Sequence, residues 1–501
     1  MIYNQTLSLA NTSITAGVVL HSARIESEAN TQPHGQHLTG SVARFAFRFA
    51  LVATVSASLI GCGNTYRPVV TAINPVGPGG QPTKYAVAIS TTGATTPGLV
   101  TFVDFSGDTV LITASIGVDP YYLAVSSDGT TGYTLNRDTT VNSFDISPAL
   151  LSTQVLETTL LAGAAPASIF PAGLHTYIPE PGRSAIADLA GSPPKLNQEF
   201  GPVANPTYVV GVTNAPRIYA LGSDSSANGQ AYTLETATDT FEQTPIAIGN
   251  NPVYGVMTAD GKRVFTMNKG DGTISVINSQ TNQLDTIPAT GKSFIPVGTN
   301  PLWADFAPTR NELVVANAGD GTTPGSVSII SIPLCSVTTV PGNPNSGCDP
   351  TNPVDAAGFG TVLATVPVGV NPVMVAVLQD GTRAYVANAG DPSLPCAAVA
   401  VAGQSTVCSV SVINLTTNTV SATITSLPDT GATGSTCSTV KPGVLCGRPN
   451  WIAATTGSPT GKVYITAGDS NNMSVIRTDV DALDTIVPLQ GKGVAVRVTA
   501  P

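Results

Sequence analysis

Residues 251–287, NPVYGVMTADGKRVFTMNKGDGTISVINSQTNQLDTI, decide the fold of this chain. Short runs rich in β-branched and aromatic residues alternate with turns at Asp260-Gly261, Asp271-Gly272 and Thr281-Asn282. Such runs, with a periodicity near two, predict strands, and Asp-Gly supplies the positive φ that tight hairpin turns require. The segment therefore predicts four consecutive antiparallel strands that form one small sheet.

The same unit recurs along the chain. Further clear copies lie at 300–332, 371–424 and 449–487, and weaker copies lie at 119–163, 165–203 and 205–249. Residues 84–117 match only the last three strands of the unit, and GVAVRVT at 493–499 is a candidate for the missing first strand. A four-stranded sheet cannot bury both of its faces alone, so the copies must stack.

Radial stacking leaves only short exposed strand edges. We therefore predict an all-β fold, a β-propeller of four-stranded antiparallel blades over residues 84–501, with the ring closed by the C-terminal strand. The repeat count gives eight blades. Seven blades is the alternative, because the copy at 165–203 is poor.

The ends of the second strands carry a specific resemblance. They read Phe265-Thr266-Met267-Asn268, Val314-Val315-Ala316-Asn317 and Tyr385-Val386-Ala387-Asn388. With the S-V-I-N segments that follow and the V-G-x-N-P joints, they resemble the YVTN-type β-propeller repeat over roughly residues 84–490. The resemblance implies an exported or surface protein, usually without enzymatic activity, and it indicates fold better than function.

The amino-terminal region resembles a targeting signal. The apolar run at 49–60, FALVATVSASLI, follows Arg44 and Arg48 and is shorter than the ~20 residues that span a bilayer. It ends in Leu59-Ile60-Gly61-Cys62, which resembles a bacterial lipoprotein signal. That resemblance implies lipidation of Cys62, and Gly63 after it favours the outer membrane. An ordinary secretory signal or a buried strand is the alternative.

These features divide the chain into four segments. We expect 1–41 to be a disordered leader or to precede a true start near Val42, 42–61 to be the signal peptide, 62–83 to be a Pro/Gly-rich tether, and 84–501 to be the propeller. The expected location is outside the cytoplasm, as a lipoprotein of the outer membrane, cell surface or periplasm.

The cysteine count fits an exported protein. Of seven cysteines, six remain when Cys62 is set aside. Six cysteines allow about fifteen pairings, and pairing of neighbours is attractive because each neighbouring pair lies in one Gly/Pro/Ser/Thr-rich insertion. The candidate disulfide cysteines are Cys335, Cys348, Cys396, Cys408, Cys437 and Cys446. Disulfides form in oxidising compartments.

Composition excludes several classes of function. The net charge is −10 with no Lys/Arg run, which disfavours nucleic-acid binding. Of four histidines, only His175 follows the predicted cleavage site, and we expect it to be solvated or to lie in a loop. With no C-x-x-C, no H-E-x-x-H and no G-x-S-x-G, the sequence predicts no metal site, no cofactor and no catalytic residues.

One set of residues stands out as a candidate ligand site. Two positions after each joint proline, at the expected start of the innermost strand, the chain carries Ser168 and the six candidate ligand residues Tyr122, Tyr208, Tyr254, Trp303, Met374 and Trp451. Both tryptophans of the protein are in this register. Such a ring of aromatic faces near the channel would stack on a flat ligand or pack blade against blade.

Two functions follow as hypotheses. The first is a lipid-anchored, non-enzymatic binding or scaffold protein of the cell envelope, with a protein or glycan ligand. The alternative is a lactonase-like hydrolase that uses the mouth of the channel, because similar propellers host that activity. Low charge and one mature histidine favour the binding protein, and Asp305 is the main charged residue in the inner register.

Overall fold

The computed structural model describes eight stretches of the chain, all in one compact unit. They are residues 84–146, 154–213, 215–288, 290–333, 358–429, 437, 443–455 and 461–499. The expectations for the leader, the signal peptide, the tether and Cys62 lie outside the described residues, as do Cys335 and Cys348. The described helices are two short 3-10 turns, Pro181–Arg183 and Pro308–Arg310, and none has the length and apolarity for a bilayer crossing.

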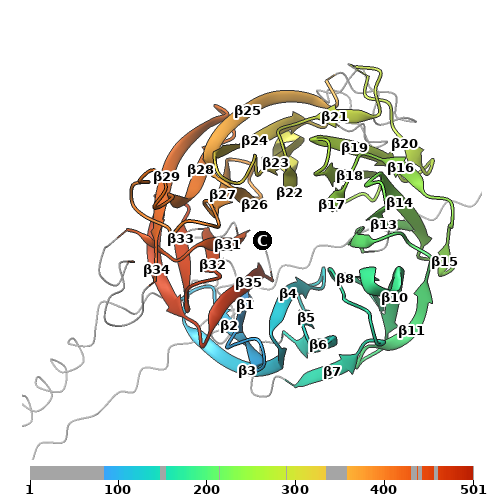
Figure 1. Cartoon of the computed structure of the whole chain (residues 1–501), viewed down its shortest axis with the longest axis horizontal. Coiled ribbons are helices and arrows are strands. Elements are labelled where there is room, and N and C mark those ends of the chain that lie inside the picture. The colour runs from blue at the N-terminus through green and yellow to red at the C-terminus, as the bar shows by residue number, and fades with distance from the viewer. Residues whose placement is uncertain are drawn as a thin grey trace, which may run out of the picture. The chain divides into compact units, whose positions relative to one another are not determined.

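The described residues form eight sheets arranged in a ring around a central axis (Figure 1), and their strands pair antiparallel except for the short outer strand of blade 7. The prediction of a propeller with eight blades is confirmed, and the alternative of seven is wrong. Blade 1 consists of β35 (Lys492–Val498), β1 (Tyr85–Thr91), β2 (Pro97–Asp104) and β3 (Val110–Val118), and blade 2 of β4 (Pro120–Val125), β5 (Thr131–Asn136), β6 (Thr140–Asp145) and β7 (Val155–Thr159). Blade 3 consists of β8 (Phe170–Ala172), β9 (His175–Glu180), β10 (Ala185–Ala190) and β11 (Lys195–Phe200). Blade 4 consists of β12 (Pro206–Val210), β13 (Arg217–Ser223), β14 (Gly229–Glu235), β15 (Thr240–Phe241) and β16 (Ile246–Ile248).

The remaining blades follow the same order from the axis outwards. Blade 5 consists of β17 (Pro252–Met257), β18 (Arg263–Asn268), β19 (Thr273–Asn278), β20 (Gln283–Leu284) and β21 (Phe294–Pro296), and blade 6 of β22 (Pro301–Ala307), β23 (Glu312–Asn317), β24 (Pro324–Ser331) and β25 (Thr361–Val370). Blade 7 consists of β26 (Pro372–Val377), β27 (Arg383–Asn388), β28 (Cys408–Asn414), β29 (Thr419–Leu427) and β30 (Leu445–Cys446). Blade 8 consists of β31 (Pro449–Thr455), β32 (Lys462–Ala467), β33 (Asn472–Arg477) and β34 (Ala482–Pro488). In blades 4 and 5 the outermost position is shared by two short strands.

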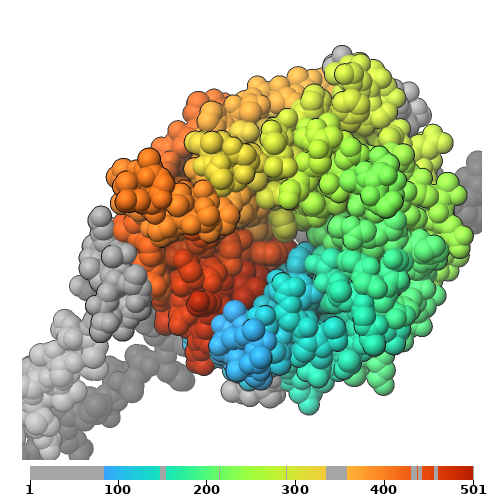
Figure 2. Space-filling model, viewed as in Figure 1, coloured from blue at the N-terminus to red at the C-terminus, as the bar shows by residue number. Residues whose placement is uncertain are grey.

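The ring is closed by the two ends of the described chain. The C-terminal strand β35 pairs antiparallel with β1, with Val496 opposite Ala88. β35 thereby becomes the innermost strand of blade 1, as the sequence predicts. In the space-filling view the blue and red ends of the described chain lie in contact (Figure 2).

The hydrophobic core lies between the blades. In the described part of the chain, eight clusters of buried side chains each join two neighbouring blades. The poor copy at 165–203 is a true blade with a short inner strand, β8, and its Tyr177 and Ile186 pack against Val209 and Ile218 of blade 4. Its weak sequence signal reflects that short strand, because three residues show no periodicity.

Most joints between blades share one backbone design. Five joint residues have φ between 39° and 54°, in the left-handed region that Asn and Asp tolerate; they are Asp119, Asn205, Asn251, Asn300 and Asn371. A proline then begins each of the inner strands β4, β12, β17, β22, β26 and β31, and each has a β-bulge directly after it. The bulge fixes which side chain of the inner strand is presented to the axis.

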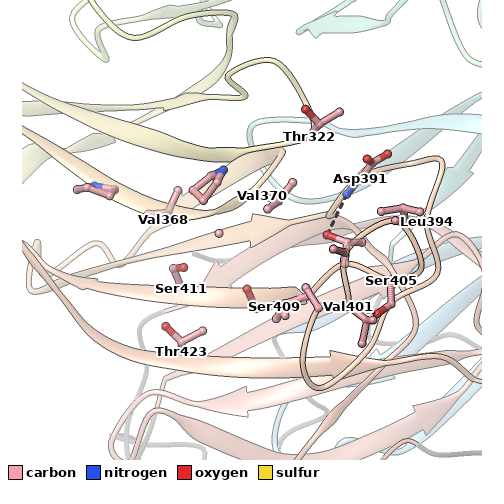
Figure 3. A pocket seen from close by; sticks show the side chains of 18 of the residues that line it. Thr322, Val368, Val370, Asp391, Leu394, Val401, Ser405, Ser409, Ser411 and Thr423 are labelled. Atoms are coloured by element: carbon pink, nitrogen blue, oxygen red, sulfur yellow. Dashed lines mark hydrogen bonds between the residues drawn. The ribbon is translucent and has the colours of Figure 1, made fainter.

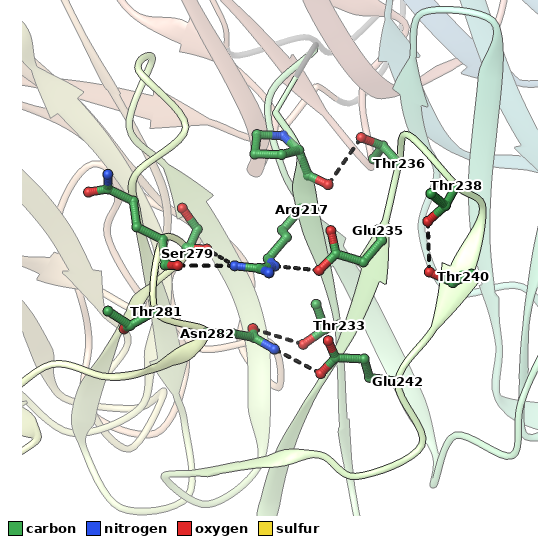
Figure 4. A network of polar contacts seen from close by, with 12 residues as sticks. Arg217, Thr233, Glu235, Thr236, Thr238, Thr240, Glu242, Ser279, Thr281 and Asn282 are labelled. Atoms are coloured by element: carbon green, nitrogen blue, oxygen red, sulfur yellow. Dashed lines mark hydrogen bonds and ion pairs between the residues drawn. The ribbon is translucent and has the colours of Figure 1, made fainter.

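Among the described residues, four junctions also carry a polar contact that we call the junction latch (Figure 4 shows Arg217 and Asn282 of one of them). Each latch combines a basic residue that begins the second strand, a tyrosine two residues later, and a turn residue of positive φ in the next blade. The latches are Arg217, Tyr219 and Asn282; Arg383, Tyr385 and Asp481; Lys462, Tyr464 and Asp108; and, in the same register, His175, Tyr177 and Asp239.

A buried charge in the closing strand tests ring closure. Val496 is fully buried between blades 8 and 1, whereas Val480 lies in an exposed turn of blade 8. We expect Val496→Asp to lower the free energy of unfolding by about 3 kcal/mol or more, because it leaves an unpaired charge in the core. The matched variant Val480→Asp should change it by less than about 0.5 kcal/mol. Urea unfolding followed by circular dichroism measures both, and equal stabilities would contradict closure by β35.

Candidate functional site

The structure places the six predicted ligand residues at equivalent positions. Each is the third residue of an innermost strand, directly after the bulge. Five of them form one cluster of rings, which we call the axial cluster: Tyr122, Tyr208, Tyr254, Trp303 and Trp451. The sixth, Met374, is buried beside it, and its Sδ accepts the backbone N–H of Ile452 at 3.4 Å.

The rings contact one another across the axis of the propeller. The Tyr254 and Trp303 rings stack with their centres 3.8 Å apart. The Trp451 ring packs edge-on against Trp303 at 5.4 Å and against Tyr122 at 5.7 Å, although these three residues belong to blades 8, 6 and 2. Contacts between blades that are not neighbours require the side chains to meet on the axis. The aromatic faces are therefore engaged with one another.

Arg497 of the closing strand completes the axial cluster. Its guanidinium carbon lies 4.8 Å from the centre of the Trp451 ring and 5.6 Å from that of Trp303, in cation–π range. Burial raises the pKa of Tyr122, while the positive charge of Arg497 opposes this rise. Sequence reasoning missed Arg497, because 493–499 has no joint proline from which to count its register.

Asp305 lies two residues after Trp303 on β22 and lines a cavity of about 500 Å³. Its two carboxylate oxygens accept the backbone N–H groups of Phe306 and Val377, each at 2.8 Å, so it links blades 6 and 7. Burial raises the pKa of Asp305 to about 6, and the two N–H groups oppose this shift. A carboxyl group with such a pKa can exchange a proton near neutral pH.

Two further carboxylates line the cavity around Asp305. Asp260 pairs with Lys262 at 3.9 Å, and Glu312 pairs with Arg310 at 2.9 Å. Each of the three acids therefore has its own partners, and their oxygens do not converge on one point within the described residues. The arrangement offers one candidate general acid or base and no paired nucleophile.

A second cavity, of about 610 Å³, lies between blades 6 and 7 (Figure 3). One wall is β25, with Val368 and Val370, and another is formed by Ser409 and Ser411 of β28. Residues 391–407, which we call the stapled loop, cover one end of it. The lining combines apolar side chains with hydroxyl groups, which suits an extended peptide better than a charged ligand.

The stapled loop is held from two sides. The disulfide Cys396–Cys408 joins it to β28. From blade 8, the Arg448 guanidinium donates hydrogen bonds to the backbone oxygens of Ala389, Asp391 and Leu394. A loop fixed in this way loses little conformational entropy when it binds a partner.

The other predicted disulfide with both cysteines described is also present. Cys437 and Cys446 are joined, with Cα atoms 4.9 Å apart. Each bond links neighbours in one insertion, at sequence separations of 12 and 9. The described cysteines therefore follow the local pairing that their spacing favours.

His175 lies in a strand and is only partly exposed, which differs from the expected solvated or loop residue. It begins β9, is partly buried, and has its Nδ1 2.8 Å from Oδ1 of Asp188. Its Nε2 lies 4.0 Å from Oδ2 of Asp239 in blade 4. The sequence did not predict this cluster, because the three residues come together only when blades 3 and 4 pack.

Comparison with known proteins identifies the fold. Dihydro-heme d1 dehydrogenase NirN, in complex with DHE, superposes with a TM-score of 0.56 at 12% identity, over 85% of this chain and 77% of that one. Apo AztD from Citrobacter koseri superposes with a TM-score of 0.51 at 12% identity, over 83% and 97%. No family model and no curated protein matches the sequence. These likenesses show a shared propeller fold alone.

The environment of Asp305 predicts a pH dependence of stability. Its folded pKa of about 6 lies above the unfolded value of ~3.9. Its stabilising contribution is therefore complete below about pH 4 and is lost as the pH rises through about 6. We expect Asp305→Asn to reduce the fall in stability between pH 5 and pH 7, as measured by urea unfolding.

A matched control is Asp320→Asn. Backbone and hydroxyl donors of Thr322 and Thr323 lower the pKa of Asp320 to about 2, so its contribution is lost only as the pH falls below ~4. Between pH 5 and pH 7 this variant should keep the wild-type slope. A wild-type slope in Asp305→Asn would contradict the burial argument.

Proposed function

We propose that this protein is an exported, lipid-anchored β-propeller that acts as a non-enzymatic docking protein of the cell envelope. The observation that carries this proposal is the axial cluster, in which Trp303 and Trp451 pack edge to face and Arg497 lies over both rings. A ligand that stacked there would first have to separate these contacts. Binding is therefore assigned to the rim of the propeller, where preformed loops and cavities are available.

The docking site on the rim is the cavity beside the stapled loop. Val399 and Val401 expose 74% and 51% of their surface, although both are large apolar residues. Val401 lines the cavity together with the apolar wall formed by Val368 and Val370, and Val399 lies two residues before it in the stapled loop. Exposed apolar side chains on a rigid loop next to a cavity are typical of a protein-binding surface. The proposed ligand is an extended segment of a partner protein, and a glycan is the other ligand that the hydroxyl-bearing lining admits.

Site-specific crosslinking in cells tests the docking site. A photoreactive residue in place of Val401 should give a discrete crosslinked product in envelope fractions. The matched control is Leu174, an isolated apolar residue that is 86% exposed on blade 3. The product should disappear in a Val399→Asp background, because the charge opposes burial of the loop. Equal crosslinking from both positions, or none from Val401, would contradict the proposal.

The anchor is tested separately. Cells fed radiolabelled palmitate should label the wild-type protein and leave Cys62→Ser unlabelled, because the thioether-linked diacylglycerol and its neighbouring acyl chain require Cys62. The variant should be released from membranes while the propeller keeps its thermal transition. Labelling of the variant, or a wild type without label, would contradict the lipoprotein assignment.

The alternative function is a lactonase-like hydrolase, which the cavity around Asp305 favours. Its single proton-exchanging carboxyl could assist attack of water on a lactone. Hydrolysis of sugar lactones that falls at least tenfold in Asp305→Asn would support this function. Hydrolysis that the variant leaves unchanged, or none in the wild type, would leave docking as the function.

A further inference from the structure

The latch between blades 3 and 4 has a different charge balance from the other three. In those, Arg217, Arg383 or Lys462 supplies a permanent positive charge. At the same position blade 3 carries His175, whose imidazole is not a permanent cation. The junction between blades 3 and 4 therefore lacks the fixed cation that its counterparts have.

The same junction has a buried carboxylate opposite its tyrosine. Asp188 lies opposite Tyr177 on β10 and is fully buried. The residues opposite the other latch tyrosines are Thr233, Val412 and Val475, which carry no charge. A buried carboxylate is costly unless a positive charge or hydrogen bonds compensate it. Asp188 has two such bonds, from His175 at 2.8 Å and from Asn197 at 2.8 Å.

Asp239 adds a second negative charge from blade 4. It lies in the turn between β14 and β15 with φ at 49°, the position of Asn282, Asp481 and Asp108 in the other latches. Its Oδ1 is buried and has no hydrogen-bond partner among the residues that the structure describes.

We propose that His175 and Asp239 bind a divalent transition-metal ion, with Zn²⁺ as the best fit, between blades 3 and 4. Nε2 of His175 faces Asp239, while Nδ1 is held by Asp188. A carboxylate on the second ring nitrogen is the usual support of a metal-bound histidine, and it fixes the tautomer that leaves Nε2 free to bind. The ion replaces the positive charge that arginine or lysine supplies elsewhere.

The geometry admits such an ion with small side-chain adjustments. The ligand atoms of His175, Asp188 and Asp239 all lie within 4.8 Å of one another. Around tetrahedral zinc, with bonds of ~2.1 Å, ligand atoms lie ~3.4 Å apart. His175 and Asp239 are partly exposed, at 26% and 36% of their side chains, so water can complete the coordination. Imidazole and carboxylate together favour zinc over magnesium, which prefers an all-oxygen octahedron.

Calorimetric titration of the full chain with ZnCl₂, after dialysis against chelator, tests the proposal. We expect one saturable site per chain and a rise in Tm with zinc. His175→Arg should abolish both effects, while restoring the latch cation found at Arg217 and Arg383, so its fold should persist without metal. Asp188→Asn should weaken binding ~10- to 100-fold through the lost support of the imidazole.

Asp239→Asn and Asp481→Asn form a matched pair of variants. Both change a latch turn residue of positive φ to asparagine, which Asn282 shows to be compatible with a latch. Only Asp239→Asn should weaken zinc binding, by at least tenfold. The absence of a saturable site, binding that His175→Arg leaves unchanged, or equal losses in the paired variants would each overturn the proposal and assign the cluster a structural role alone.

Discussion

The regular blades depend on a buried asparagine that ends the second strand. In Asn268, Asn317 and Asn388 the amide nitrogen donates to two hydroxyl groups on the third strand, which fixes the register of those two strands. The joint glycine before the blade makes room for that amide: a Cβ at Gly298 would lie 2.8 Å from Asn317. The V-G-x-N-P joint and the terminal asparagine of the second strand are therefore two halves of one contact.

This contact determines where the inner side chains go. Because the joint glycine packs against the asparagine, the left-handed joint residue and the proline start the inner strand at the same level along the propeller axis in successive blades. The bulge then presents the third residue to the axis, so the large rings of several blades meet there. A motif far from the axis thus produces the axial cluster. The stability of the ring and the closure of its centre have the same origin.

The features that repeat were predictable from the sequence, and those that depend on ring closure were not. Turn dipeptides, strand periodicity and the terminal segment at 493–499 predict the blades and their closure, because these are local patterns. The axial register of Trp303 and Trp451 also follows from counting after the joint proline. Arg497 and the contact of His175 with Asp239 unite residues from separate copies, and no spacing within one copy records which side chains meet across a junction.

Blade 3 departs most from the repeat, and its departures are chemical. Where the regular second strands end in asparagine, β9 ends in Glu180, which is buried and whose pKa is raised to about 8 by burial and by Glu199, despite Arg183. His175 stands where the other latches have a permanently charged arginine or lysine, and Asp188 stands where they have an uncharged residue. Glu180 and Asp188 are buried and His175 is partly buried. The two buried carboxyl groups cost stability that the common motif would retain, which supports a site in this blade.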